Sequence, residues 1–318
     1  MNTEELKINE ITNKFFSKST FLHKLFPRLT VFHIRKKSAR RLDKLFFDIC
    51  KKFSVKNFID CGANVGGDSL QAINAGFNNV LAIEPNPYPF VNMVFKPSEQ
   101  FKKINVGLSD KEEVLKFYSL KSVEIGPRLE TATNASFVVP KNNLNKYDVI
   151  EVPVIPLDKL LKNSIEINSS FALWIDVEGM QEEVLTGAQE TLKHKNCKLI
   201  KIEVENEPIF NKRLSVSKDI ENFLTNLGYE AIYRDFEYVS CYNILFVKKD
   251  DAFHLEMEIN NSFDDIAESI NISNISSYLI YFFLLRKLKA LVIKIFGSRV
   301  GNIIAALYGS KESKNFLK

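Results

Sequence analysis

Short apolar runs alternate with polar turns and with stretches of helical spacing along residues 55–248. Several runs end in an acidic or glycine-containing turn, after which apolar residues recur every three or four positions, as on one face of a helix. Strand, turn and helix in this order predict an open α/β sheet, whose ligands bind at the carboxyl ends of the parallel strands. The predicted strands are residues 55–59, 79–83, 104–110, 114–118, 149–155, 171–175, 198–204, 229–234 and 242–248, the last two as an antiparallel pair.

The first turn has the composition of a ligand-binding loop. It reads Asp60-Cys61-Gly62-Ala63-Asn64-Val65-Gly66 and precedes a helix that begins near Gly67. The two glycines allow unusual backbone conformations and let a ligand approach the main chain, while the start of the helix presents free N–H groups. Alternatives are an ordinary turn and a dinucleotide site, but the G-x-G-x-x-G fingerprint is incomplete. Because Asp60 suits an ammonium or sulfonium group better than a diphosphate, the loop favours S-adenosylmethionine.

The second predicted strand ends in Glu84-Pro85-Asn86. Glu84 lies near the spacing at which a carboxylate accepts hydrogen bonds from ribose hydroxyls, and its two oxygens match a cis-diol. The third strand ends in Ser109 and Asp110, which are placed to meet an adenine ring, although an ordinary turn would have the same composition. Two strands that each bring a carboxylate to the same edge of the sheet predict a cofactor site there.

A buried apolar strand at residues 171–175 ends in two carboxylates, Asp176 and Glu178. Residues two apart in a strand point to the same side, and Gly179 permits the turn into a helix through residues 184–192 with one apolar face. Acids at the end of a strand beside a ligand loop predict a functional role for at least one of them.

A carboxylate at such a position can act as a general base, which contributes about 10² to 10⁴ in rate. Asp176 and Glu178 are the first candidates for this base, and Glu205 is the next. In an alternative that we do not favour, these two acids and Glu203 or Glu205 hold a divalent metal such as Mg²⁺, which prefers oxygen ligands.

The ordered motifs are Asp60-x-Gly62-Ala63-Asn64-x-Gly66, Glu84-Pro85-Asn86, Leu108-Ser109-Asp110, Leu157-Asp158, and Ile175-Asp176-Val177-Glu178-Gly179 followed by Val184-Leu185-x-Gly187-Ala188. Together they resemble the FkbM-type methyltransferases over about residues 55–248. The resemblance implies a class I methyltransferase with a Rossmann-like α/β fold, whose seven-stranded sheet is mostly parallel with the last strand antiparallel. It implies S-adenosylmethionine as cofactor and usually O-methylation, often of sugars in glycans or natural products.

The cofactor-binding residues by position are Asp60, Gly62, Ala63, Asn64, Gly66, Glu84, Asn86, Ser109, Asp110 and Asp176. One departure is Met180-Gln181, where such proteins commonly carry Ala or Tyr followed by Glu.

The length of 318 residues, with 45% hydrophobic and 26% charged residues, predicts a globular core of about 190 residues with appended segments. We expect a helical basic N-terminal extension at residues 1–54, the methyltransferase domain at 55–249 and a helical C-terminal extension at 250–318. The polar segment 119–147 is long enough to form a lid or a substrate surface.

The net charge of +4 is unevenly distributed: residues 1–56 carry +9, residues 57–278 carry −12 and residues 279–318 carry +7. The basic cluster at residues 35–41 suits phosphate or anionic lipid, or else a solvated helix face, and the acidic body argues against nucleic acid as a partner. Within residues 275–299, basic residues interrupt the apolar run before the roughly 20 residues of a membrane span. This pattern predicts a basic amphipathic helix that contacts the body, another subunit or an anionic membrane.

The four cysteines lack C-x-x-C spacing, and no signal peptide is apparent. These two features predict a cytoplasmic protein, and contact with the membrane surface is an additional possibility. The leading hypothesis is O-methylation of a sugar or glycan hydroxyl, with a lipid-linked glycan as one form of the acceptor. A non-catalytic module of the same fold and an NAD-dependent sugar oxidoreductase are the alternatives.

Overall fold

The structure is a computed structural model that describes residues 27–120, 135–139, 147–164, 168–205, 217–235 and 241–255. The chain divides into two compact units, residues 1–31 with 265–318 and residues 32–264. The fold and the site described below belong to the second unit.

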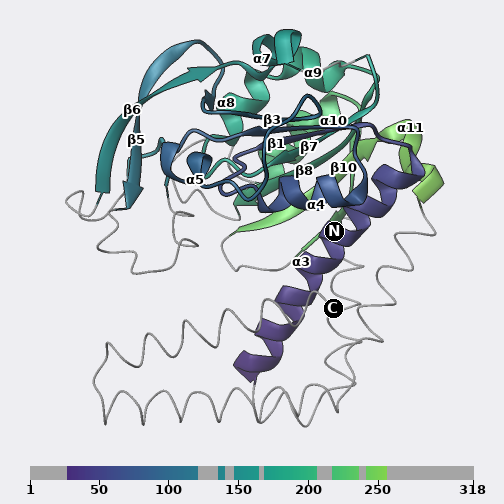
Figure 1. Ribbon diagram of the computed structural model, residues 1–318. Helices are drawn as coiled ribbons and strands as arrows, with labels where there is room; N and C mark the ends of the chain where they lie inside the picture. The colour runs from purple at the N-terminus through teal and green to yellow at the C-terminus, as the bar shows by residue number, and fades with distance from the viewer. Residues whose placement is uncertain are drawn as a thin grey trace. The chain divides into compact units, whose positions relative to one another are not determined.

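A seven-stranded sheet forms the centre of this unit (Figure 1). In spatial order its strands are β3 (Phe101–Ile104), β2 (Asn79–Ile83), β1 (Asn57–Cys61), β7 (Phe171–Ile175), β8 (Cys197–Glu205), β10 (Cys241–Lys248) and β9 (Tyr229–Arg234). The pairs from β3 to β8 are parallel, whereas β10 is antiparallel to both β8 and β9. The predicted α/β fold class, with a mostly parallel sheet and an antiparallel last strand, is confirmed.

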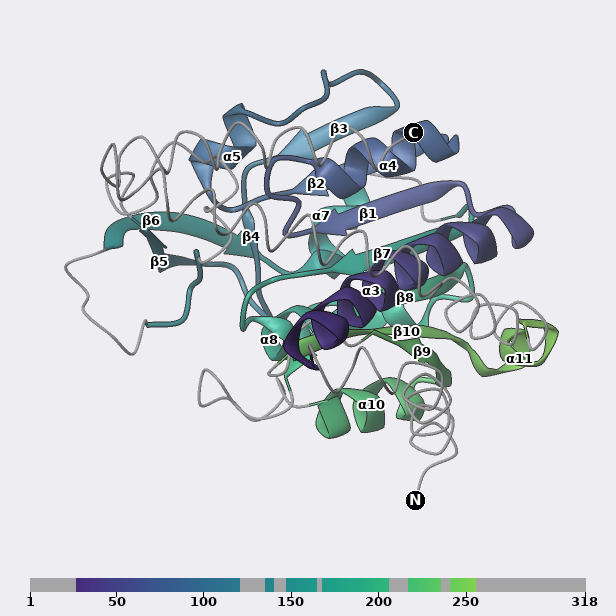
Figure 2. The same cartoon turned by 90° about the horizontal axis from the view of Figure 1, so that it is seen from below.

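Helices cover both faces of this sheet. Figures 1 and 2 show α3 (Pro27–Lys52) and α4 (Gly67–Ala75) on one face, with α7 (Leu157–Ser164), α8 (Gln181–Thr186) and α9 (Gln189–Lys193) on the other. The shorter or more peripheral helices are α5 (Pro87–Val91) after β2, α10 (Ser217–Asn226) against β8 and β9, α11 (Lys249–Ala252), and a 3-10 turn (Phe253–Leu255). Because helices cover both faces, β1 and β7 are buried along their whole length, and β7 reads as a continuous apolar run.

The second half of α3 packs against the sheet (Figure 2). Leu42, Phe46 and Ile49 have no exposed surface. The Phe46 ring meets Trp174 of β7 and Phe58 of β1 edge to face, with centroid distances of 5.1 and 5.9 Å. Burying each of these side chains contributes about 1.5–3 kcal/mol. This half of α3 is therefore part of the core, while the domain boundaries expected at residues 55 and 249 stay predictions.

A second, three-stranded sheet lies beside the first and was not expected as a separate layer. Its order is β4 (Gly107–Leu108), β6 (Tyr147–Ile155) and β5 (Glu113–Leu120), with β4 parallel and β5 antiparallel to β6. The strands predicted at residues 114–118 and 149–155 are confirmed, and they form this accessory sheet.

The single third strand predicted at residues 104–110 is wrong. Strand β3 ends at Ile104, and the Asn105 side chain donates hydrogen bonds to the carbonyl oxygens of Glu84 (2.7 Å) and Pro85 (3.1 Å). These bonds hold the chain where it leaves the central sheet. The following residues then pair with β6 instead, as strand β4.

Three of the sequence motifs hold the helical layer together. The Asp158 carboxylate accepts hydrogen bonds from the Glu190 and Thr191 amides at 2.9 and 2.7 Å, and so caps α9. Any Cβ at Gly187 would overlap the carbonyl oxygen of Ser109, so the α8–α9 junction packs directly on the turn after β4. The predicted helix through residues 184–192 is accordingly two short helices that meet at this glycine.

No helix within the described ranges is long and apolar enough to cross a membrane. The amphipathic segment predicted at residues 275–299 lies outside those ranges, as does most of the polar segment 119–147.

The Asp158 cap gives a direct test of this packing. Replacing Asp158 by Ala leaves two amides of α9 without their acceptor, so we expect the free energy of unfolding to fall by about 1 to 2 kcal/mol in urea denaturation. Asp219→Ala, in the exposed first turn of α10, should change it by less than about 0.5 kcal/mol. Equal effects of the two substitutions would contradict the assigned role of Asp158.

Candidate active site

The loop after β1 is shaped by a close approach of two main chains. Gly62 has φ +91° and would clash with the carbonyl oxygen of Asp176 if it carried a Cβ. The amide of Asp176 donates a 2.9 Å hydrogen bond to the Cys61 carbonyl, which ties the turn after β7 to the end of β1. Asn64 (φ +49°) and Gly66 (φ +80°) continue the loop in the left-handed region, and Gly66 begins α4. Glycine is therefore needed at position 62 for steric reasons.

A cavity of about 260 Å³ opens at the carboxyl ends of β1, β2 and β7. Its walls come from the loop after β1, the end of β2, the turn after β7 and an apolar group contributed mainly by the accessory sheet. The lining residues are Gly62, Ala63, Asn64, Val65, Gly67, Asp68, Ile83, Glu84, Pro85, Pro89, Val106, Leu108, Phe117, Ala135, Phe137, Asp176, Val177 and Glu178. The edge of the sheet that the sequence predicts as a cofactor site is thus hollow.

Glu84 lines this cavity, and its predicted contact with a ribose stays a prediction. Its Oε2 accepts a hydrogen bond from the Asn64 amide and its Oε1 accepts one from the Asn86 amide, both at 2.7 Å. Burial raises the pKa of Glu84 to about 7, against the lowering effect of those two amides. Each carboxylate oxygen has a second acceptor position, so Glu84 retains capacity for ribose hydroxyls. Asn86 itself caps α5 and does not line the cavity.

Asp60 lies beneath the cavity and does not line it. The side chain is 1% exposed and accepts a 2.5 Å hydrogen bond from the Ser69 hydroxyl of α4. Burial, followed by the charge of Asp68, raises the pKa of Asp60 well above its usual range. Asp60 therefore joins the end of β1 to the start of α4 through its hydrogen bond with Ser69. Its direct contact with a cofactor stays a prediction.

Asp68 lines the cavity but was missed by the sequence reading. It lies in the first turn of α4, two residues after Gly66. Burial raises the pKa of Asp68 to about 6, although the charge of Lys201 opposes the shift. The signal that could have found it is an acid in the first helical turn directly after a glycine loop, where the N-terminus of a helix faces the ligand.

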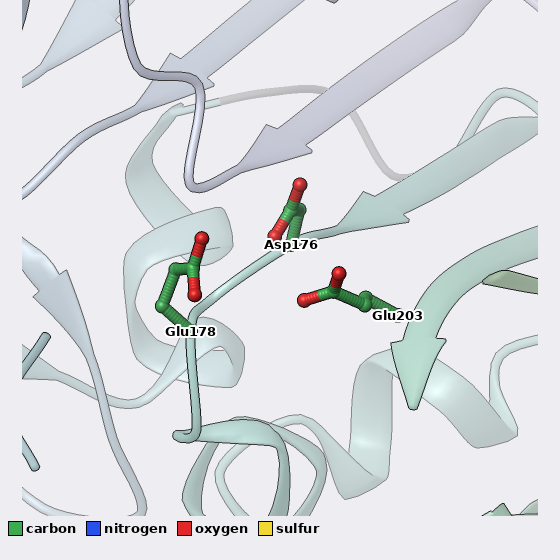
Figure 3. A group of neighbouring side chains, drawn as sticks. All are labelled: Asp176, Glu178 and Glu203. Carbon is green, nitrogen blue, oxygen red and sulfur yellow. The ribbon is translucent and has the colours of Figure 1, made fainter. Parts of the chain in front are cut away.

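Three carboxyl groups gather beside the cavity (Figure 3). Asp176 and Glu178 follow β7, Glu203 comes from β8, and one oxygen atom of each lies within 4.8 Å of the others. Burial raises the pKa of Glu178 to about 8 and that of Glu203 to about 9, and each is raised further by the charge of Asp176. Such a group can share protons or accept a divalent cation through its oxygens. Glu205 lies two residues after Glu203, at the end of β8. Its side chain is buried, with 3% of its surface exposed, and it does not belong to this group of three carboxyl groups.

Lys201 supplies a positive charge behind these acids. Its Nζ donates a 2.6 Å hydrogen bond to Asp43 of α3 and lies 3.3 Å from the centroid of the Trp174 ring. The charge of Lys201 opposes the burial-driven rise in the pKa of Asp176 and of Asp68. Helix α3, which precedes all the sequence motifs, thus contributes to the electrostatics of the site.

Ser109 and Asp110 line a second cavity of about 510 Å³, next to the first. Ser109 is 1% exposed, and its hydroxyl donates a 3.2 Å hydrogen bond to Asp110. Leu108 lines the first cavity instead, and Phe137 lines both. The adenine contacts predicted for Ser109 and Asp110 therefore stay a prediction, while apolar residues form the nearest wall of the first cavity.

The raised pKa values predict how stability depends on pH. Because Glu84, Glu178 and Glu203 hold protons in the folded state that the unfolded chain releases above about pH 4.5, the free energy of unfolding should fall as pH rises toward about 9. Glu203→Gln cannot ionise and should lose less stability between pH 7 and 9, measured by urea denaturation in EDTA. Glu190→Gln, whose side chain is 79% exposed, should behave like the unmodified chain. Parallel pH profiles for Glu203→Gln and the unmodified chain would contradict the buried acid group.

Comparison with solved structures finds methyltransferases of low sequence identity. Magnesium protoporphyrin IX methyltransferase from Synechocystis PCC 6803, with bound S-adenosylmethionine, is 11% identical, with 75% of this chain and 96% of that chain covered and a TM-score of 0.36. TrmK from M. capricolum, in complex with S-adenosyl-homocysteine, is 14% identical over 82% and 91% of the two chains, with a TM-score of 0.31. Precorrin-6y C5,15-methyltransferase from Geobacter metallireducens is 12% identical over 61% and 80%, with a TM-score of 0.33. At such scores these likenesses carry no conclusion about this chain.

No curated protein matches the chain. The family described as Methyltransferase FkbM domain matches residues 60–231, more than half of the chain. The matched range begins at Asp60 and includes Glu84 and the acids after β7. The chain therefore belongs to the FkbM methyltransferase family and is an S-adenosylmethionine-dependent methyltransferase.

Proposed function

We propose that the protein transfers a methyl group to a hydroxyl of a sugar or glycan, with a lipid-linked glycan as one form of the acceptor. The observation that carries the proposal is Glu178, a carboxyl group that lines the cofactor cavity and is poised to accept a proton. The resemblance to FkbM-type proteins, which often methylate sugars, supports the acceptor class.

The residues of the cavity fit S-adenosylmethionine. Glu84 faces the cavity with acceptor capacity for a ribose diol, and Asp68 and Asp176 provide negative charge for a cation. The Oδ1 atom of Asn64 is buried without a hydrogen-bond partner among the described residues, which leaves an acceptor for a donor group of the ligand. When bound, the cofactor supplies a methyl group that its sulfonium has activated.

The protein then has to align the acceptor oxygen and remove its proton. Alignment of this kind can contribute about 7 to 11 kcal/mol in favourable cases. Glu178 would take the hydroxyl proton while the acceptor oxygen receives the methyl group that the bound cofactor would supply. Because burial raises the pKa of Glu178 to about 8, its ionised form is a stronger base than an ordinary glutamate and is still populated near neutral pH. Asp176, close beside it, increases the proton affinity of Glu178, because its charge raises the pKa of that carboxyl group further.

We also propose that the reaction takes place in the cytoplasm, without nucleic acid as a partner. The four cysteines are free thiols, and Cys50, Cys61 and Cys197 are buried, as suits a reducing compartment. The proposed membrane or subunit contact through residues 275–299 rests on the sequence pattern alone.

Substituting the proposed base tests the mechanism. Glu178→Gln and Asp176→Asn should lower methyl transfer about 100-fold or more, while in Glu178→Gln the dissociation constant for S-adenosylmethionine changes by less than about threefold. Transfer is measured with labelled cofactor and an extract of cell glycans, and affinity by isothermal titration calorimetry. Glu190→Gln is the matched control on an exposed glutamate. Full activity of both site variants would exclude these acids as the base, and label found only in non-saccharide material would exclude the acceptor class.

A further inference from the structure

Residues 135–139 form one wall of the cofactor cavity. The backbone of Ser136 pairs with Tyr118 of β5, through N–H···O bonds of 2.8 and 3.0 Å in the two directions. Ala135 and Phe137, on either side of Ser136, line the cavity. This segment, which we term the cavity strap, is thus joined to the accessory sheet at Ser136 and lines the cavity on either side of that residue.

Phe137 inserts into the apolar end of the cavity. Its ring packs against Phe117 of β5 in an edge-to-face arrangement, with a centroid distance of 4.8 Å. It also lies directly over Gly107 of β4, where any Cβ would meet the ring. A flat cofactor group in this end of the cavity would contact Phe137, since the rest of the wall there is aliphatic or aromatic.

The neighbouring side chain, Ser136, reaches the proposed base. Its hydroxyl donates a 2.5 Å hydrogen bond to the carbonyl oxygen of Glu178 and accepts a 3.0 Å bond from the Val138 amide. Ser136 is 8% exposed, so this hydrogen bond is shielded from water. Glu178 has φ +45°, a left-handed conformation that is disfavoured for a residue with a side chain and that persists only where the surroundings hold it.

We propose that Ser136 is a positioning residue that couples occupancy of the cofactor cavity to the conformation of Glu178. Cofactor that packs against Phe137 fixes the cavity strap, and the strap fixes the main chain of Glu178 through the Ser136 hydroxyl. The side chain of Glu178 is thereby held toward the cavity when cofactor is present. The inference rests on the proposed role of Glu178 as the base, but it is tested without any acceptor.

The test measures hydrogen–deuterium exchange in the peptide that spans residues 176–181, with and without S-adenosylmethionine. In the unmodified protein the cofactor should slow exchange in this peptide. In Ser136→Ala, exchange without cofactor should be about fivefold faster, and the protection by cofactor should be clearly smaller than in the unmodified protein. Ser136→Thr retains a hydroxyl and should restore the protection. Ser170→Ala, which removes a similar serine-to-carbonyl bond to Ser54 at 3.1 Å, should leave it unchanged.

Affinity separates positioning from binding. By calorimetry, Phe137→Ala should weaken S-adenosylmethionine binding about tenfold, whereas Ser136→Ala should change it less than about twofold. Thermal unfolding identifies any variant that has lost its fold. If Ser136→Ala or Phe137→Ala does not fold, Ser136→Thr or Phe137→Leu is compared with the unmodified protein in its place. Cofactor protection of residues 176–181 that is as large in Ser136→Ala as in the unmodified protein would overturn the proposal. Failure of glycans as acceptors, with the exchange results as expected, would remove the proposed substrate and leave the coupling standing.

Discussion

The site depends on the contact between the main chains of Gly62 and Asp176. Strands β1 and β7 pair in parallel from Asn57 and Phe171 to Cys61 and Ile175, so they end side by side. The hydrogen bond from the Asp176 amide to the Cys61 carbonyl extends this pairing by one residue, and the space that remains beside Gly62 admits no side chain. The glycine loop and the acids after β7 are therefore walls of the same cavity because of strand register. A larger residue at position 62 would separate them.

The electrostatics of the cavity follow from this proximity. Acids that follow β2 and β7 and acids of α4 and β8 lie together in a partly buried region, where burial raises the pKa of each and the charge of Asp176 adds to the rise for the others. Two backbone amides donate hydrogen bonds to Glu84 and so oppose the rise in its pKa. The charge of Lys201 opposes the rise in the pKa of Asp68 and of Asp176. Such an arrangement destabilises the empty protein at high pH, and it suits a ligand that carries positive charge.

Sequence reasoning recovers the parts of this structure that are encoded locally. Strand β7 is an apolar run of five residues and β2 has four apolar residues in a row, and the turn chemistry of Gly62 and the acids after β7 is visible without any structure. The accessory sheet was missed because β4 has only two residues and its pairing with β6 joins segments about 45 positions apart. Asn105, whose side chain ends the third strand, looks like an ordinary strand-exit residue in the sequence.

Side-chain placement within the site was harder to predict than the site itself. Asp60 lies inside β1, level with Ala82 of β2, whereas Glu84 follows the end of β2. Accordingly Asp60 is bonded to Ser69 and does not line the cavity, while Glu84 does. Phe117 and Phe137 reach the cavity only through the accessory sheet, so their contribution depends on contacts that no local pattern reports. The acids after β7 were found because both lie on one short turn.

The central claim is that S-adenosylmethionine occupies the cavity between the loop after β1, Glu84 and the acids after β7. A crystal structure with S-adenosyl-homocysteine tests it most directly. The account predicts ribose hydroxyls within hydrogen-bond distance of the Glu84 carboxylate and the sulfur atom on the side of Asp176 and Glu178. A nucleoside bound outside this cavity, or one that leaves Glu84 without a ribose contact, would contradict it.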